Sequence, residues 1–348
     1  MDPFLRHKVA LTSFCLLCLL IFLILISFYW LVFRPPSDTS LTKVVYIKRG
    51  MHLKQVSEML QQEGIIRNRH LFTLITTALG KKAKVKAGEY EFTTQMLPFE
   101  VLDTLVKGQV KRHLVTIPEG YTLSQIAQLL EDLNIVDKRS FLQKACSPAF
   151  IFSFGLSYPV KGGIGPTLEG YLFPETYHLI RDMDPDEVLQ TMVHQFRKVF
   201  EPDLANRASQ LGISEREVVI LASIIEKETS LSAEKLLISA VFHNRLKKKI
   251  PLQSDPTVIY GIKNFDGNLT KEYLLRPTPY NTYLINGLPP TPICNPGKDS
   301  LHAALYPAPV PYLYFVSKND GSHYFSSDIE EHQRAVWKYQ KNPRKRGL

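Results

Sequence analysis

The distribution of apolar and charged positions marks one long uncharged segment near the N-terminus. Residues 9–33 are 25 consecutive positions without a charge, most of them Leu, Ile or Phe. At about 1.5 Å per residue, such a helix spans roughly 37 Å and would cross a ~30 Å hydrocarbon core with some tilt. The segment ends in Phe28-Tyr29-Trp30 rather than at a small-residue cleavage site, which favours an uncleaved anchor over a signal peptide. We therefore expect a transmembrane helix over 9–33, with residues 1–8 left in the cytoplasm.

Two stretches that lie 70 residues apart share one apolar pattern. IKRGMHLKQVSEMLQQEGIIRNRHLF begins at Ile47, and IPEGYTLSQIAQLLEDLNIVDKRSFL begins at Ile117. In both, a short apolar strand precedes a glycine, and apolar residues then recur at helical spacing. The pattern predicts two units of strand, turn and amphipathic helix, the second over 117–147. Between them, residues 88–92 alternate like a strand and residues 98–107 are helical in pattern.

The C-terminal half alternates predicted helices with short strands. Asp184 is followed by proline and begins one helix, and Ser214 forms a capping box with Glu217 at the start of the next. Further predicted elements are a helix over 232–247, a strand over 312–317 and a final helix over 328–339. Helices around short strands predict an α+β fold.

The net charge of +9 suggests a nucleic-acid partner only until its distribution is considered. The last eleven residues carry five Lys or Arg and no acid, and residues 1–33 carry a net charge of +1. Residues 34–337 therefore have a net charge of only +3. A nearly neutral folded part with a basic tail over 341–348 predicts no nucleic-acid partner.

The four cysteines are too few for a disulfide framework. Cys15 and Cys18 lie within the apolar segment, and a pair between Cys146 and Cys294 stays open. Basic residues flank the segment on both sides, so the charges alone do not fix its orientation. The sequence contains no HExxH, P-loop or GxSxG motif, and we expect neither a metal nor a cofactor.

The helix that begins at Ser214 contains the strongest candidate for chemistry. Its residues 218–225 are apolar except for Ser223, and it ends in Glu226-Lys227-Glu228. At 100° per residue the two glutamates point about 200° apart, and Glu228 follows the more apolar stripe. A carboxyl beside apolar groups has a raised pKa, as a general acid near neutral pH requires. The alternative is a solvated helix end, and the pattern alone leaves both open.

Several motifs in order give this candidate a context. The strings ASIIEKET, VFHNRL, LQSDPTVIYG, PYNTYLINGLPP and PYLYFV resemble the YceG/MltG family of membrane-anchored endolytic murein transglycosylases. The resemblance implies that Glu228 is catalytic. It also implies a location at the cell inner membrane, a single-pass topology and a catalytic domain on the periplasmic side. The implied partners are peptidoglycan glycan strands, the lipid bilayer and, as further candidates, peptidoglycan synthases.

Other residues are suited to a glycan groove, because flat rings cover sugar faces and amides or hydroxyls bind sugar hydroxyls. Turn, cap or buried structural roles are the alternatives for several of them. Glu169 and Glu175 are compatible with structural roles. His323 and His332 are further candidates for substrate contact, although a lone histidine more often has a structural role. The candidate substrate-binding residues are Asn244, Gln253, Asp255, Tyr280, Asn281, Thr282 and Tyr283.

These patterns divide the exported part into a linker over 34–43 and two folded regions. Residues 44–112 form a βααβ unit that resembles a LysM module, which binds N-acetylglucosamine-containing glycans; a structural platform without ligand is the alternative. Residues 113–340 form a mixed α+β catalytic domain that includes the second repeat.

The resemblance implies an endolytic lytic transglycosylase that cleaves the β-1,4 bond between N-acetylmuramic acid (MurNAc) and N-acetylglucosamine (GlcNAc). The products would carry 1,6-anhydro-MurNAc ends, and the cleavage would end or release nascent strands. One rival is a hydrolase of the same bond, with Asp255 or Glu226 as the second carboxylate. The other is a membrane-tethered, non-catalytic scaffold that binds peptidoglycan.

Overall fold

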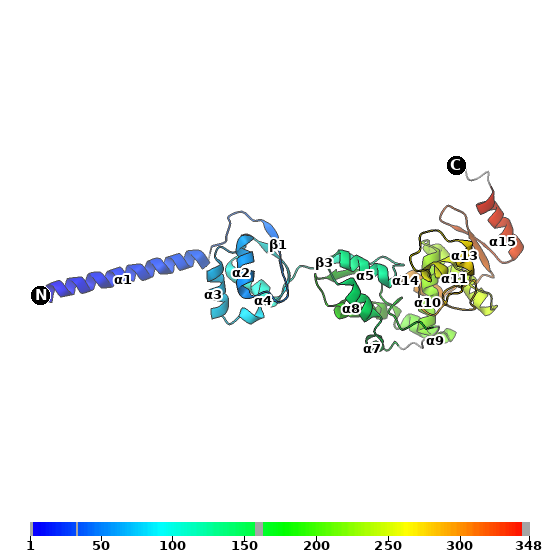
Figure 1. Cartoon of the computed structure of the whole chain (residues 1–348), viewed down its shortest axis with the longest axis horizontal. Helices are drawn as coiled ribbons and strands as arrows, with labels where there is room; N and C mark the ends of the chain where they lie inside the picture. The colour runs from blue at the N-terminus through cyan, green and yellow to red at the C-terminus, as the bar shows by residue number, and fades with distance from the viewer. Residues whose placement is uncertain (1–2, 33, 157–162, 343–348) are drawn as a thin grey trace. The chain divides into compact units, whose positions relative to one another are not determined.

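The computed structural model describes residues 3–32, 34–156 and 163–342, and Figure 1 traces its elements in order. Helices dominate, and the strands of the described residues form three two-stranded sheets. The predicted α+β class is therefore confirmed. The chain separates into two compact units, Met1–His113 and Leu114–Leu348. Most of the predicted basic tail, residues 343–348, lies outside the described residues.

The first unit begins with helix α1 (Pro3–Val32). Within the described part of the chain, no helix combines the length and the hydropathy that a membrane crossing requires. The transmembrane helix predicted over 9–33 is thus not supported.

The rest of the first unit is a small α+β fold. Strands β1 and β2 pair antiparallel, with Ile47 opposite Gly88. Because side chains alternate along a strand, Val45, Ile47, Tyr90 and Phe92 all enter the core. The strand–helix–helix–strand order is the expected one, and the likeness to LysM stays a prediction. The elements are β1 (Thr42–Ile47), α2 (Leu53–Gln62), α3 (Arg69–Ala78), a 3-10 turn (Lys82–Lys84), β2 (Gly88–Thr93) and α4 (Pro98–Lys107).

The second unit contains more helices and a larger core. Its strand pairs are β3 with β4 and β5 with β6. Its first elements are β3 (His113–Thr116), α5 (Leu123–Asp132), α6 (Lys138–Ala145), α7 (Pro148–Phe152), β4 (Thr176–Leu179), α8 (Pro185–Phe200) and α9 (Asp203–Leu211). They are followed by α10 (Glu215–Glu228), α11 (Ser232–Lys247), α12 (Asp255–Tyr260), α13 (Lys271–Leu275), α14 (Lys298–Leu305), β5 (Tyr314–Ser317), β6 (His323–Ser326), α15 (Ile329–Val336) and a π-turn (Trp337–Lys341).

The repeat seen in the sequence recurs in the structure. Helix α5 starts 70 residues after α2, and each helix follows a glycine with positive φ, +85° at Gly50 and +75° at Gly120. Only glycine adopts that backbone conformation without strain. The repeats differ in the spacing of their partner strands: β1 pairs with β2, which begins 46 residues after it, whereas β3 pairs with β4, which begins 63 residues after it.

Helix α10 is the buried centre of the second unit. The predicted capping box is present, and all eight residues from Val218 to Ile225 are buried. The helix contacts α9, α11, α12 and α14, which explains why it is apolar on every side. Cys146 is exposed and Cys294 is buried, and both are free, so the disulfide that the sequence left open does not form.

Equivalent leucines of the two repeats provide a test of the division of the chain into two compact units. Leu60 and Leu130 are both fully buried, in separate cores. Replacing either by Ala should cost about 2–5 kcal/mol of unfolding free energy, because the smaller side chain leaves a cavity. We expect Leu60→Ala to destabilise only the first unit and Leu130→Ala only the second, measured by hydrogen–deuterium exchange in urea. Equal loss of protection in both units would show that they unfold as one.

Candidate active site

Glu228 is the last residue of α10, where the helix gives way to extended backbone at Thr229. The Ser254 hydroxyl donates a hydrogen bond to Glu228 Oε1 at 2.5 Å. Burial raises the pKa of Glu228 to about 7, and the charge of Asp255 adds to the increase. The Ser254 hydrogen bond and the Arg245 charge act against the increase. The net effect is a carboxyl whose pKa is raised toward neutral pH.

Ser254 is held in place by Thr282. The Ser254 backbone N–H donates to Thr282 Oγ1 at 3.0 Å, and the Gln253 N–H donates to the Thr282 carbonyl at 3.0 Å. Thr282 Oγ1 also lies 2.8 Å from Thr257 Oγ1. Gln253 itself has a φ of +52°, which turns the chain sharply before α12. Thr282 is fully buried, so its observed role is to fix the loop that carries Ser254.

Arg245 of α11 fixes the same loop from the other side. Its Nη1 donates to the Leu252 carbonyl at 3.0 Å and to Gln253 Oε1 at 3.1 Å. Its Nε donates to the Leu313 carbonyl at 2.7 Å. Only 7% of Arg245 is exposed. A buried cation with these contacts sets the position of the loop, and its charge lowers the free-energy cost of ionising Glu228.

Asn244 and Asn281 use their side chains internally. The Asn244 amide donates to the carbonyls of Val310 and Tyr312, both at 2.9 Å. The Asn281 amide donates to backbone carbonyls of α13 and its C-cap, and Asn281 Oδ1 accepts from the Tyr283 N–H at 3.0 Å. Asn281 is fully buried. These contacts show structural roles, and substrate binding by either residue stays a prediction.

The exposed polar groups beside Glu228 are those of Asp255, Gln253 and Tyr283. The Tyr283 hydroxyl donates to Asp255 Oδ1 at 2.6 Å and thereby orients that carboxylate. Tyr280 instead bonds Thr291 at 2.8 Å and packs edge-on against Tyr260. Of the predicted contacts, Asp255, Gln253 and Tyr283 are the ones that lie beside Glu228 and reach the surface.

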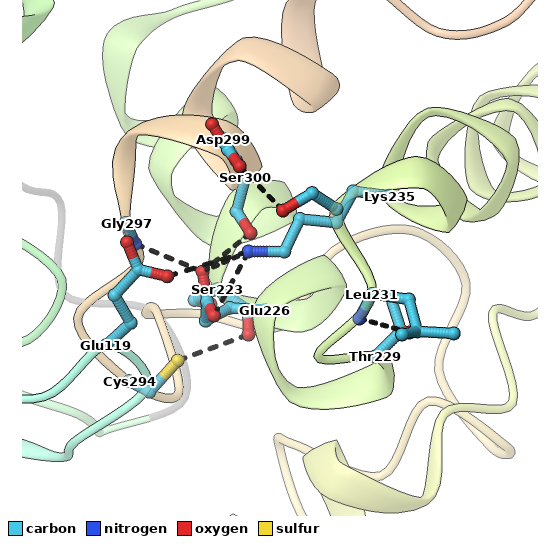
Figure 2. Close-up of polar contacts among 11 residues, drawn as sticks. Glu119, Ser223, Glu226, Thr229, Leu231, Lys235, Cys294, Gly297, Asp299 and Ser300 are labelled. Carbon is cyan, nitrogen blue, oxygen red and sulfur yellow. Dashed lines mark hydrogen bonds and ion pairs between the residues drawn. The ribbon is translucent and has the colours of Figure 1, made fainter. Parts of the chain in front are cut away.

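Glu226 lies in a different environment, which Figure 2 shows. Lys235 Nζ is 3.1 Å from Glu226 Oε2, and only 4% and 7% of the two side chains are exposed. Ser300 Oγ and the Gly297 N–H also donate to Oε2, at 2.6 and 3.1 Å. Glu119 lies further from the same ammonium, at 3.8 Å. Glu226 is thus a charge-paired structural residue, and it is not free to act as a second acid or base.

Glu169 is a second buried carboxyl with a raised pKa. Its Oε1 accepts from the Leu123 N–H at 2.9 Å and from Asn295 Nδ2 at 3.0 Å, and its Oε2 accepts from the Tyr260 hydroxyl at 3.0 Å. Desolvation raises the pKa of Glu169 to about 7 despite these donors. The residue ties α5, α12 and the 295 loop together.

The remaining candidates lie elsewhere. His323 pairs with Glu234 at 2.7 Å, His332 stacks on Tyr314, and Glu175 is exposed. Over residues 3–32, 34–156 and 163–342, no group of three or more His, Cys, Asp or Glu is arranged to hold a metal ion.

The sequence patterns did not single out Ser254, Arg245 or Lys235. Ser254 and Arg245 lie within the quoted motifs, but nothing in those motifs shows that the two residues meet Glu228 and its loop. One usable signal existed. Arg245 follows Phe242 by three residues and so lies on the same helix face as a buried ring. A charge on an apolar face indicates a buried structural or functional cation.

Comparison with known proteins identifies relatives of the chain. The profile of the YceG-like family matches residues 45–338. An endolytic murein transglycosylase of Bacillus subtilis (strain 168) is 31% identical over 314 residues, 87% of this chain and 86% of the relative. One from Streptococcus pneumoniae serotype 2 is 29% identical over 328 residues, 86% of this chain but 59% of the longer relative.

A solved structure agrees with these matches. The crystal structure of a YceG-like protein from Listeria monocytogenes shares 32% identity, with a TM-score of 0.60, and covers 85% of this chain and 100% of that one. The family match extends over most of the chain, and the Bacillus relative is similar over most of both lengths. The chain therefore belongs to the YceG-like family.

Proposed function

We propose that this protein is an endolytic peptidoglycan lytic transglycosylase that cleaves the β-1,4 bond between MurNAc and GlcNAc. Its family membership and the names of its relatives support the activity class. The observation that carries the mechanism is one partly buried carboxyl, Glu228, with a pKa raised to about 7 and a hydroxyl donor on one oxygen.

In the first step Glu228 acts as the acid. Its protonated carboxyl gives the proton to the glycosidic oxygen as the bond from that oxygen to C1 of MurNAc breaks. Ser254 donates to Oε1 and stabilises the carboxylate that results. Oε2 is left to carry the transferred proton.

In the second step the same carboxylate acts as the base. It takes the proton from the C6 hydroxyl of MurNAc, whose oxygen bonds to C1 and closes the 1,6-anhydro ring. Glu228 returns to its starting protonation state and no water is consumed. One carboxyl therefore serves both steps, unlike the paired acids of ordinary glycosidases. The pairing of Glu226 with Lys235 is consistent with this mechanism.

A hydrolase is the second candidate, and one observation favours it. Asp255 is exposed and close enough to raise the pKa of Glu228, so it could activate a water in place of the C6 hydroxyl. Hydrolysis would leave reducing ends rather than anhydro ends.

The proposal has three further parts. They are cleavage within nascent strands, action with peptidoglycan synthases, and a location at the cytoplasmic membrane with the catalytic unit outside. The location follows from the position of peptidoglycan outside that membrane, and the other two follow from the family resemblance of the sequence motifs. A reporter enzyme fused to the C-terminus would test the location: export-dependent activity supports it, and activity only in the cytoplasm contradicts it.

Glu228→Gln tests the assignment of the acid. The amide keeps the shape of the side chain but cannot transfer a proton, so we expect kcat on purified sacculi to fall by at least about a hundredfold. Folding should be retained by circular dichroism. Glu330→Gln, on the exposed face of α15, is the matched control and should keep full activity.

Mass spectrometry of the products separates the candidate functions. The wild type should release fragments with anhydro ends, one water lighter than reducing ends, and Asp255→Asn should still produce them. Reducing ends that disappear in Asp255→Asn would establish the hydrolase. Binding of sacculi without any soluble fragment would instead indicate a scaffold.

The raised pKa also predicts how stability depends on pH. The native protein holds the Glu228 proton more tightly than the unfolded chain does, so this stabilisation is complete below about pH 4.3 and is lost as the pH rises through about 7. Glu228→Gln cannot titrate. Between pH 5 and pH 8 the free energy of unfolding of the variant should therefore rise relative to that of the wild type, by on the order of 1–3 kcal/mol in urea unfolding. A difference that does not change with pH would contradict the shift.

A further inference from the structure

A cavity of about 870 Å³ lies in the second unit, beside the end of α10. Ser124 and Gln125 of α5 form its polar wall, and Ile259 of α12 with Phe265 forms an apolar wall. Lys227 of α10 also lines it. The volume falls within the range of pockets that bury a small ligand.

The cavity adjoins the reacting centre at two points. Lys227 directly precedes Glu228, and consecutive Cα atoms are about 3.8 Å apart. Pro256, which also lines the cavity, directly follows Asp255, the residue whose charge acts on Glu228. A substrate whose scissile bond lies at Glu228 therefore has this space beside it.

Lys227 supplies the cavity with a charge that is not neutralised locally. Its side chain is exposed, its Nζ donates to the Gly120 carbonyl at 3.4 Å, and it forms no ion pair with any described residue. Lys235, by contrast, is bound to Glu226. The carboxyl of the wall, Glu169, is 3% exposed and accepts three hydrogen bonds. The cavity thus combines a cation with polar and apolar walls, which suits an anionic group that has amides and small apolar parts.

Building on the proposed function, we propose that this cavity receives the peptide stem of the MurNAc residue at which the strand is cut, and that Lys227 binds a stem carboxylate. The stem leaves the sugar from the lactyl ether at C3 of the same ring whose C1 bond breaks, so it must occupy space next to Glu228. It carries amides, alanine methyl groups and free carboxylates. The amides match Ser124 and Gln125, the methyl groups match the wall of Ile259 and Phe265, and a carboxylate matches Lys227. The protein would accordingly prefer strands that carry stems over bare glycan.

Paired substrates test this preference. Glycan strands with stems are compared with the same strands after an amidase has removed the stems, and the readout is the ratio of the two kcat/KM values. We expect a wild-type ratio of about ten, the usual effect of a hydrogen bond to a charged group. Lys227→Met should bring the ratio near one, Lys227→Arg should restore most of it, and the control Lys198→Met, on an exposed position of α8, should leave it unchanged.

A binding measurement separates this proposal from the proposed function. N-acetylmuramyl-L-alanyl-D-glutamic acid is titrated by calorimetry into Glu228→Gln protein with and without Lys227→Met, and we expect about tenfold weaker binding in the double variant. A wild-type ratio near one, equal loss of Lys227→Met on both substrates, or unchanged binding would overturn the stem proposal while anhydro products still supported the activity. If the wild type cuts neither substrate, the proposed function fails, and the calorimetry alone decides the role of the cavity.

Discussion

Burial of α10 on all sides holds two glutamates at its last turn in opposite electrostatic environments. The packed core around Val218–Ile225 fixes the direction in which each side chain leaves the helix. Glu226 emerges against Lys235 and is neutralised as half of an ion pair. Glu228 lies at a site where desolvation outweighs the local donors, so the pKa of its carboxyl is raised to about 7. The helix thus supplies one charge-paired carboxylate and one carboxyl with a raised pKa from two residues of the same type.

The polar groups around Glu228 come from segments that are distant in sequence. Ser254 precedes α12 and Thr282 follows α13. Arg245 of α11 donates a hydrogen bond to the carbonyl of Leu313, which directly precedes β5. Each is buried and hydrogen-bonded to backbone, so the loop that meets Glu228 is fixed before substrate binds. The proposed mechanism requires such preorganisation, because a single carboxyl must give up a proton and take one back in nearly the same position.

Local patterns predicted the parts of this structure that depend on neighbouring residues. The repeat, the capping box at Ser214, the extent of α11 and the apolar stripe that ends at Glu228 follow from periodicity and turn chemistry. The Glu226–Lys235 pair and the Arg245 contacts could not be predicted, because they depend on how helices pack. For the same reason Asn281 reads as a glycan-binding amide in sequence, whereas the structure commits that amide to backbone carbonyls. The expected transmembrane helix also found no support.

The proposed mechanism requires that the Glu228 carboxyl act as both acid and base while water takes no part. Digestion of purified sacculi in water enriched in oxygen-18 tests this most directly, because each hydrolytic event places a solvent oxygen on the new end. We expect the MurNAc ends released by the wild type to carry no label above background. Labelled reducing ends in proportion to the bonds cut would contradict the mechanism and assign the reaction to a hydrolase.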